Sequence, residues 1–146
     1  MKKLKLVVVG KLKEKYFVDA CNEYLKRLSR FADVQIYEIK DRPDGIAAES
    51  ADILEVVKGY TILADIGGAT MSSEEFSACL SSALETSDTV TFIIGGSCGV
   101  DDRVRAKADK RISFGRMTYP HMLMRVIALE QIYRAFTIKE GLPYHK

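Results

Sequence analysis

The chain has 146 residues, of which 47% are apolar and 9% aromatic, and 22 Lys and Arg against 20 Asp and Glu give a formal net charge of +2. A globular chain of this length buries roughly 68–70% of the surface that its unfolded form exposes, which excludes an intrinsically disordered protein. Cys21, Cys79 and Cys98 are widely spaced and form no C-x-x-C pair, so neither a disulfide framework nor a zinc site is expected.

Strands and helices are expected to alternate along the chain. The strand segments are short apolar runs that end at glycine, such as those before Gly10 and Gly67, whereas the helices repeat apolar residues at helical spacing. Ser72 or Ser73, with Glu75 or Glu74 nearby, indicates a helix start. In chain order, the expected elements are strand 4–9, helix 16–28, strand 34–39, helix 46–58, strand 60–66, helix 72–85, strand 89–94, helix 102–108, strand 111–114 and helix 120–139.

This order predicts the α/β class, with a mainly parallel sheet covered by helices on both faces, in one domain over residues 1–146. The longest apolar stretches, 6–9 and 90–94, are far shorter than the roughly 20 residues that cross a bilayer, so no membrane helix is expected. The basic N-terminus is followed by neither a long apolar run nor a cleavage site, so we expect no secretory signal and a cytoplasmic protein.

The charges are unevenly distributed. Residues 1–31 carry 9 basic and 3 acidic groups, residues 32–100 carry 3 and 12, and residues 101–146 carry 10 and 5. If the two basic ends lie together in the fold, or meet across a dimer, they form a positive surface suited to a polyanion. An ordinary solvated, lysine-rich surface is the alternative.

Three loops after expected strands are candidates for ligand binding, because ligands of open parallel sheets bind at the carboxyl ends of the strands. They are 65–68, 95–99 and 114–120. The second has the pattern G-G-x-x-G, which matches neither the dinucleotide nor the phosphate-loop fingerprint. Asp101 and Asp102 also stand where the next helix begins and would repel a pyrophosphate, so an uncharged adenosine fits better. A tight turn without any ligand is the alternative.

The last helix is apolar over more than one stripe, so we expect it to be buried on two sides, in part by a second subunit of a homodimer. Arg125, Glu130, Gln131 and Arg134 interrupt it, and burying them is costly unless they are paired with each other or with neighbours. The tail 141–146 ends in an aromatic, an imidazole and a cation, the groups that stack on and bond to an unpaired base.

Taken together, these segments resemble a known family. The segments that show the resemblance are F-I-I-G-G-S-C-G-V at 92–100, R-I-S-F-G-R-M-T-Y-P-H-M-L-M-R-V-I-A-L-E-Q-I-Y-R-A-F at 111–136, P-Y-H-K at 143–146 and the opening L-V-V-V-G-K-L-K at 6–13. They look like the ribosomal RNA large-subunit methyltransferase H family, of the SPOUT class. The resemblance implies a C-terminal trefoil knot, a homodimer and S-adenosylmethionine as methyl donor, with no metal. The implied acceptor is N3 of a pseudouridine in the helix 69 stem-loop of 23S rRNA, in the large subunit or the assembled ribosome.

The resemblance also implies a cofactor pocket and a set of catalytic residues. At the third strand either Leu63 or Ala64 forms the wall of the pocket, and the resemblance assigns this place to Ala64. The stretch between 43 and 60 looks shorter than in many members of the family. The residues implied to bind the cofactor are Ala64, Gly95, Phe114, Gly115, Arg116, Met117, Thr118 and Tyr119. The catalytic candidates are Arg125 or Arg134 as the cation beside the base, Tyr144 stacking on it, and His145 of the partner subunit as proton acceptor.

Two other functions keep the same scaffold. One is a methyltransferase acting on another rRNA site or on tRNA, and the other is a catalytically idle RNA-binding module of ribosome assembly. A nucleotide-binding regulator is a third alternative, and the missing phosphate fingerprints disfavour it.

Overall fold

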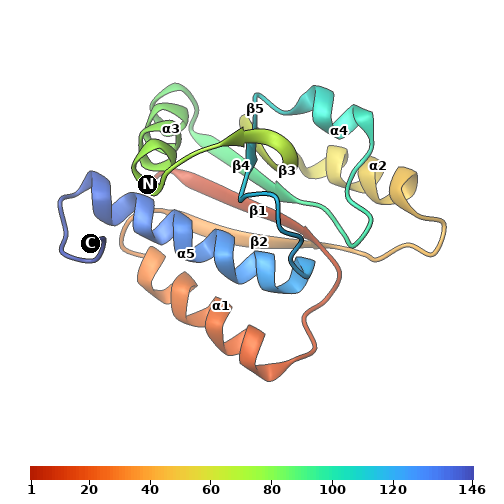
Figure 1. Cartoon of the computed structure of the whole chain (residues 1–146), viewed down its shortest axis with the longest axis horizontal. Helices are drawn as coiled ribbons and strands as arrows, with labels where there is room; N and C mark the ends of the chain where they lie inside the picture. The colour runs from red at the N-terminus through yellow and green to blue at the C-terminus, as the bar shows by residue number, and fades with distance from the viewer.

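The computed structural model describes residues 1–146 and has a single sheet flanked by helices (Figure 1). Strands and helices alternate throughout, as expected. The elements are β1 (Lys3–Val9), α1 (Lys15–Leu28), β2 (Asp33–Ile39), α2 (Ile46–Val56), β3 (Tyr60–Thr70), α3 (Ser73–Thr86), β4 (Thr89–Ile94), α4 (Asp102–Lys107), β5 (Lys110–Ser113) and α5 (His121–Lys139).

The sheet is entirely parallel, in the order β2-β1-β4-β3-β5, which confirms the predicted α/β class. Along β1, Leu4, Leu6 and Val8 face a core shared with α1, α3 and α5, whereas Val7 and Val9 face a smaller core under α2 and α4. Because side chains alternate between the two faces of a strand and both faces are covered, residues 6–9 of β1 form an unbroken apolar run.

Local signals set the helix starts. Ser72 accepts a hydrogen bond from the Glu75 amide (3.0 Å), and the Glu75 carboxylate accepts one from the Ser72 amide (3.0 Å), so α3 begins with a complete capping box. Asp101 caps α4 by accepting from the Arg103 amide at 3.0 Å. Both starts agree with the sequence prediction.

Strand β3 is longer than predicted, because it continues past its two glycines to Thr70. Its pairing with β5 breaks after Ala64 and resumes at Ala69, so residues 65–68 form a bulge. A Cβ on Gly68 would lie 2.6 Å from the Arg111 carbonyl carbon, so the glycine allows two backbones to approach rather than ending the strand.

The sheet has two functionally distinct rims. The carboxyl rim consists of the end of β3 with its bulge and the following turn, 65–72, and of the loops that follow the other strands, 10–14, 40–45, 95–101 and 114–120. The amino rim is the opposite side, where the strands begin, and both chain termini lie there (Figure 1). Helix α5 runs from one to the other: its first turn lies against Gly10 after β1, and Lys139 near its end lines a hollow with Lys2 before β1.

The basic ends of the chain are therefore divided between the rims. At the amino rim, Lys2, Arg30 and Lys139 surround one hollow, but Glu85 and Glu140 line it too. The charge there is mixed, so the meeting of the termini alone does not make a strongly positive surface. No helix combines the length and apolar character needed to cross a membrane.

Candidate active site

A cavity of about 390 Å³ opens at the carboxyl rim, where β3, β4 and β5 end. The three predicted loops all contribute to it, together with the first turn of α5. Of the residues expected to bind a cofactor, seven line it: Ala64, Gly95, Phe114, Gly115, Met117, Thr118 and Tyr119. Arg116, the eighth, is exposed and is not among the lining residues.

The wall residue at β3 is Ala64. Leu63 is fully buried in the opposite core, beneath α2 and α4, because successive side chains of a strand point to opposite faces. Ala64 pairs with Ile94 on one side and Ile112 on the other, which places it centrally at the base of the cavity.

The glycine loop after β4 forms the second wall. Gly99 has φ +83° and its amide donates to the Gly96 carbonyl at 2.9 Å, which closes a tight turn. A Cβ on Gly95 would lie 2.9 Å from both the Gly99 carbonyl carbon and Val100 Cγ1, so only glycine fits without movement of the loop. Behind it, Ser50 of α2 accepts a hydrogen bond from the Asp101 amide at 3.0 Å and fixes the end of the loop.

The third wall is the segment 114–120 between β5 and α5. Ser113 begins it with a closed turn, because its hydroxyl accepts from the Gly115 amide at 3.1 Å and donates to the Gly115 carbonyl at 3.0 Å. Gly115 has φ +107°, a conformation that favours glycine. Met117 and Tyr119 then line the cavity and are also exposed to solvent.

The charged side chains of the lining are neutralised in pairs. Arg105 bonds Asp102 at 2.6 Å, and that hydrogen bond raises the pKa of the guanidinium. Asp65 bonds Arg111 at 3.2 Å. The cavity is thus walled by backbone, apolar groups and paired charges, which suits a ligand recognised by shape and backbone hydrogen bonds.

Two lining residues, His121 and Met124 of α5, were not among the predicted cofactor contacts. Both lie in the first turn of α5, which begins at the carboxyl rim. The signal that could have found them is topological: a helix start directly after a binding loop lies beside that loop.

The catalytic candidates Arg134, Tyr144 and His145 form a separate cluster. Glu130 accepts from Arg134 Nε at 2.8 Å, the Arg134 guanidinium stacks 4.8 Å from the Tyr144 ring centre, and its Nη1 lies 3.0 Å from His145 Nδ1. His145 Nε2 also pairs with Glu74 at the start of α3. The tail is therefore docked on α5 and α3 of its own chain.

The electrostatics of this cluster follow from its contacts. The hydrogen bond to Glu130 raises the pKa of Arg134, and the hydrogen bond from His145 lowers the pKa of Glu74. Burial, assisted by Tyr24 and by the negative charge of Glu130, raises the pKa of Tyr144 to about 12. Arg134 is therefore a permanent cation and Tyr144 a neutral phenol at physiological pH.

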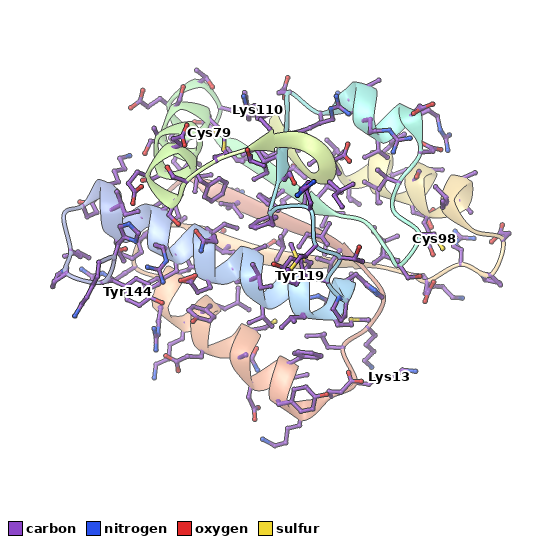
Figure 2. The ribbon with its side chains drawn as sticks, viewed as in Figure 1. Lys13, Cys79, Cys98, Lys110, Tyr119 and Tyr144 are labelled. Atoms are coloured by element: carbon purple, nitrogen blue, oxygen red, sulfur yellow. The ribbon has the colours of Figure 1, made fainter.

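Within one chain this cluster does not reach the cavity. Met124, which lines the cavity, and Arg134 are ten residues apart on the same helix, so their backbones are separated by about 15 Å along its axis. Figure 2 shows the same division, with Tyr144 at one end of α5 and Tyr119 near the other.

The remaining candidate, Arg125, is a buried residue that is only 1% exposed. It bonds Glu38 at 2.6 Å and the Gly10 carbonyl at 2.8 Å, and its Nε has no partner. It ties α5 to the ends of β1 and β2 and does not line the cavity. The pairing expected for the polar interruptions of α5 is confirmed, with Glu38 the neighbour that pairs with Arg125.

Comparison with known proteins agrees with this architecture. Residues 2–145 match the family described as "Predicted SPOUT methyltransferase". The chain is 46% identical over 158 aligned positions to "Ribosomal RNA large subunit methyltransferase H" of Streptococcus pneumoniae strain CGSP14, and equally to that of strain JJA, covering 99% of each chain.

Two solved structures share the fold. One is a probable methylase family protein from Haemophilus influenzae Rd KW20, with a TM-score of 0.58, 9% identity, and coverage of 98% of this chain and 70% of that one. The other is a probable methyltransferase from Bordetella pertussis Tohama I, with a TM-score of 0.55, 12% identity, and coverage of 92% and 94%. These likenesses are consistent with the knotted fold of the class.

Proposed function

The chain belongs to the SPOUT methyltransferase family and to its ribosomal RNA large subunit methyltransferase H group, and on that premise we propose that it transfers a methyl group from S-adenosylmethionine to N3 of a pseudouridine in the helix 69 stem-loop of 23S rRNA. The observation that carries the proposal is the cavity at the carboxyl rim, into which the backbone of three loops converges without a free charge. As an enzyme of ribosomal RNA, the protein would act in the cytoplasm.

The cavity fits the proposed donor in size and chemistry. Its volume of about 390 Å³ lies in the range of small-ligand sites, and its apolar and backbone groups suit an adenosine that carries no phosphate. Ala64, Gly95 and the lining residues of the segment 114–119 would hold it, and the missing Cβ of Gly95 lets Gly99 and Val100 close the loop that forms one wall. When bound, the donor supplies an already activated methyl group.

The remaining chemistry is the positioning of the base and the removal of its N3 proton. We assign the cation that stabilises the developing anion to Arg134 rather than Arg125, because Arg125 is buried against Glu38 and Gly10. His145 would accept or position the proton, and Tyr144, a neutral phenol beside Arg134, would stack on the base.

These assignments require a homodimer. The cavity and the tail cluster lie about 15 Å apart along α5, so a single chain cannot apply both to one base. A two-fold dimer that places α5 of one subunit beside that of the other brings the tail of the partner to the cavity and creates two equivalent sites. The half-buried apolar side chains Leu123 and Ile127 on α5 are suited to that contact.

The direct test uses labelled S-adenosylmethionine and ribosomes that lack the modification. We expect label on 23S rRNA, at N3 of one pseudouridine, and calorimetric binding of the donor to the protein alone. Label on tRNA or at another rRNA position would replace the acceptor that we propose. Well-folded protein that gives no heat with the donor or its spent sulfide product would contradict the enzymatic proposal and favour the RNA-binding module.

A further inference from the structure

The carboxyl rim carries cations that no carboxylate neutralises. Lys11 and Lys13 in the loop after β1, and Arg116 in the loop after β5, are exposed and take part in none of the ion pairs of the structure. The single acid in these two loops is Glu14, so the loops together carry an excess positive charge. Lys40 in the neighbouring loop is offset by two acids, Asp41 and Asp44.

Exposed apolar side chains gather on the same rim. Of the five large apolar residues that the fold leaves exposed, four lie there: Tyr16 (67% exposed), Ile66 (63%), Met117 (77%) and Tyr119 (37%). Tyr16 stands in the first turn of α1, three residues after Lys13, and Tyr119 stands three residues after Arg116. Each of the two loops thus offers a free cation followed by an exposed aromatic ring.

Both loops lie beside the cavity. His121 lines the cavity, and its Nε2 lies 3.7 Å from where a Cβ on Gly10 would be, so the loop that begins at Gly10 adjoins the cavity wall. Tyr119 itself lines the cavity. Lys13 and Tyr119 both lie toward the start of α5, away from Tyr144 (Figure 2).

At the amino rim, acidic side chains lie among the cations, although Arg30 and Lys139 form no ion pair. Lys2 there bonds Asp88 at 3.2 Å, and Arg30 and Lys139 share their hollow with Glu85 and Glu140. No exposed tyrosine accompanies them, since the one large exposed apolar residue outside the carboxyl rim is Met1. The aromatic rings in the amino-rim hollow, Phe31 and Phe136, are half-buried or buried, so exposed rings accompany cations at the carboxyl rim.

We propose that the carboxyl rim is a docking surface for unpaired RNA beside the cavity, with phosphates bound by Lys11, Lys13 and Arg116 and bases stacked on Tyr16 and Tyr119. The proposal rests on the proposed function and adds the surface that holds the RNA. Free cations alone would suit any polyanion, including a duplex, but rings exposed between them suit bases that are free to stack. RNA held along this surface would present one of its bases to the opening of the cavity.

The first test measures methyl transfer to unmodified ribosomes by the double variant Lys11→Ala/Lys13→Ala. We expect KM for ribosomes to rise at least about tenfold while kcat changes less than about twofold, because lost phosphate contacts weaken binding. The salt dependence should also flatten, by roughly 0.7 per lost contact in the slope of log affinity against log salt. Donor binding by calorimetry should stay unchanged, since neither lysine lines the cavity.

The matched control is Arg30→Ala/Lys139→Ala at the amino rim, which removes the same charge from the other basic group. Its KM and salt slope should stay within about twofold of the parent. Equal losses in both double variants would show a general charge effect and overturn the surface, as would an unchanged KM in the lysine variant. A parent protein that transfers no methyl group at all would instead refute the proposed function, so the two failures are distinguishable.

The second test concerns the rings. A single-stranded oligonucleotide should inhibit methyl transfer by the parent more strongly than a duplex with the same number of phosphates. Tyr16→Ala should reduce that preference about fivefold or more, because a stacked base is lost, whereas Tyr16→Phe should keep it. Equal inhibition by duplex and single strand, or an unchanged preference in Tyr16→Ala, would overturn the assignment to unpaired RNA.

Discussion

The two ends of helix α5 differ in almost every property that matters for catalysis. Its first turn borders a cavity in which every charge is paired, whereas its last turns carry a cluster of Glu130, Arg134, Tyr144 and His145 that is rich in titratable groups. A helix of 19 residues is about 28 Å long, so one base cannot touch both ends of one chain. On the proposed function, each chain holds two parts of a site, and the proposed homodimer would join the cavity of one subunit to the tail of the other.

Mixing two inactive variants tests most directly whether the cavity and the tail of different chains act together. We expect Gly95→Val, which fills the cavity wall, and His145→Ala, which removes the proton acceptor, each to lower methyl transfer at least about 100-fold. Mixed after joint refolding, they should recover about a quarter of the parent rate, since half of the dimers are mixed and each holds one intact site. A mixture that stays inactive would place both halves in the same chain.

The two arginines of α5 should separate stability from activity. Arg125→Ala is expected to lower the free energy of unfolding by about 2–4 kcal/mol. The substitution removes the hydrogen-bond donor of the buried Gly10 carbonyl and creates a cavity where the side chain was. Arg134→Ala should cost about 1 kcal/mol or less, since its pair with Glu130 is partly solvated, while removing most of the activity. Urea unfolding with single-turnover assays measures both, and equal stability losses would contradict the distinction.

A glycine at the cavity and one before the tail offer a smaller contrast. Gly95→Ala should weaken donor binding about tenfold, because its Cβ would meet Gly99 and Val100 at 2.9 Å and shift the loop. Gly141→Ala, at φ +68° with open space around it, should cost about 1 kcal/mol of stability through strain and leave donor affinity as it is. Calorimetry on both proteins provides the comparison, and a tighter donor complex in Gly95→Ala would be the contrary result.

The smallest expected effect is a pH dependence confined to the tail. Because burial raises the pKa of Tyr144 from 10.0 to about 12, the docked tail favours the protonated phenol. Its contribution to docking is complete below about pH 10 and is lost as pH rises toward 12, since the released tail ionises first. Ultraviolet absorbance should show late tyrosine ionisation, and Tyr144→Phe should reduce its amplitude and leave the part due to Tyr60, whose pKa burial also raises. A titration identical in both proteins would contradict the docked tail.

Much of the cavity lining could be predicted from sequence because its parts are local. Of the eight residues expected there, six line the cavity from loops directly after strands and a seventh, Ala64, from within β3, and a parallel sheet brings such loops to one rim whatever the strand order. Arg116 differs because consecutive loop residues need not point the same way. The catalytic candidates were less predictable, since residue type alone does not distinguish Arg125, a buried tie, from Arg134, a stacked and partly exposed cation.

The sequence by itself determined the alternation of strands and helices, the covering of both faces of the sheet and the capped starts of α3 and α4. These features depend on apolar spacing and on contacts within a few residues, which a linear chain displays directly. Only the tertiary structure decided that β3 continues through a bulge, that Ala64 rather than Leu63 meets the cavity, and that the tail docks far from it. Those outcomes depend on which distant segments pack together. Contacts within one helix or strand do not determine that packing.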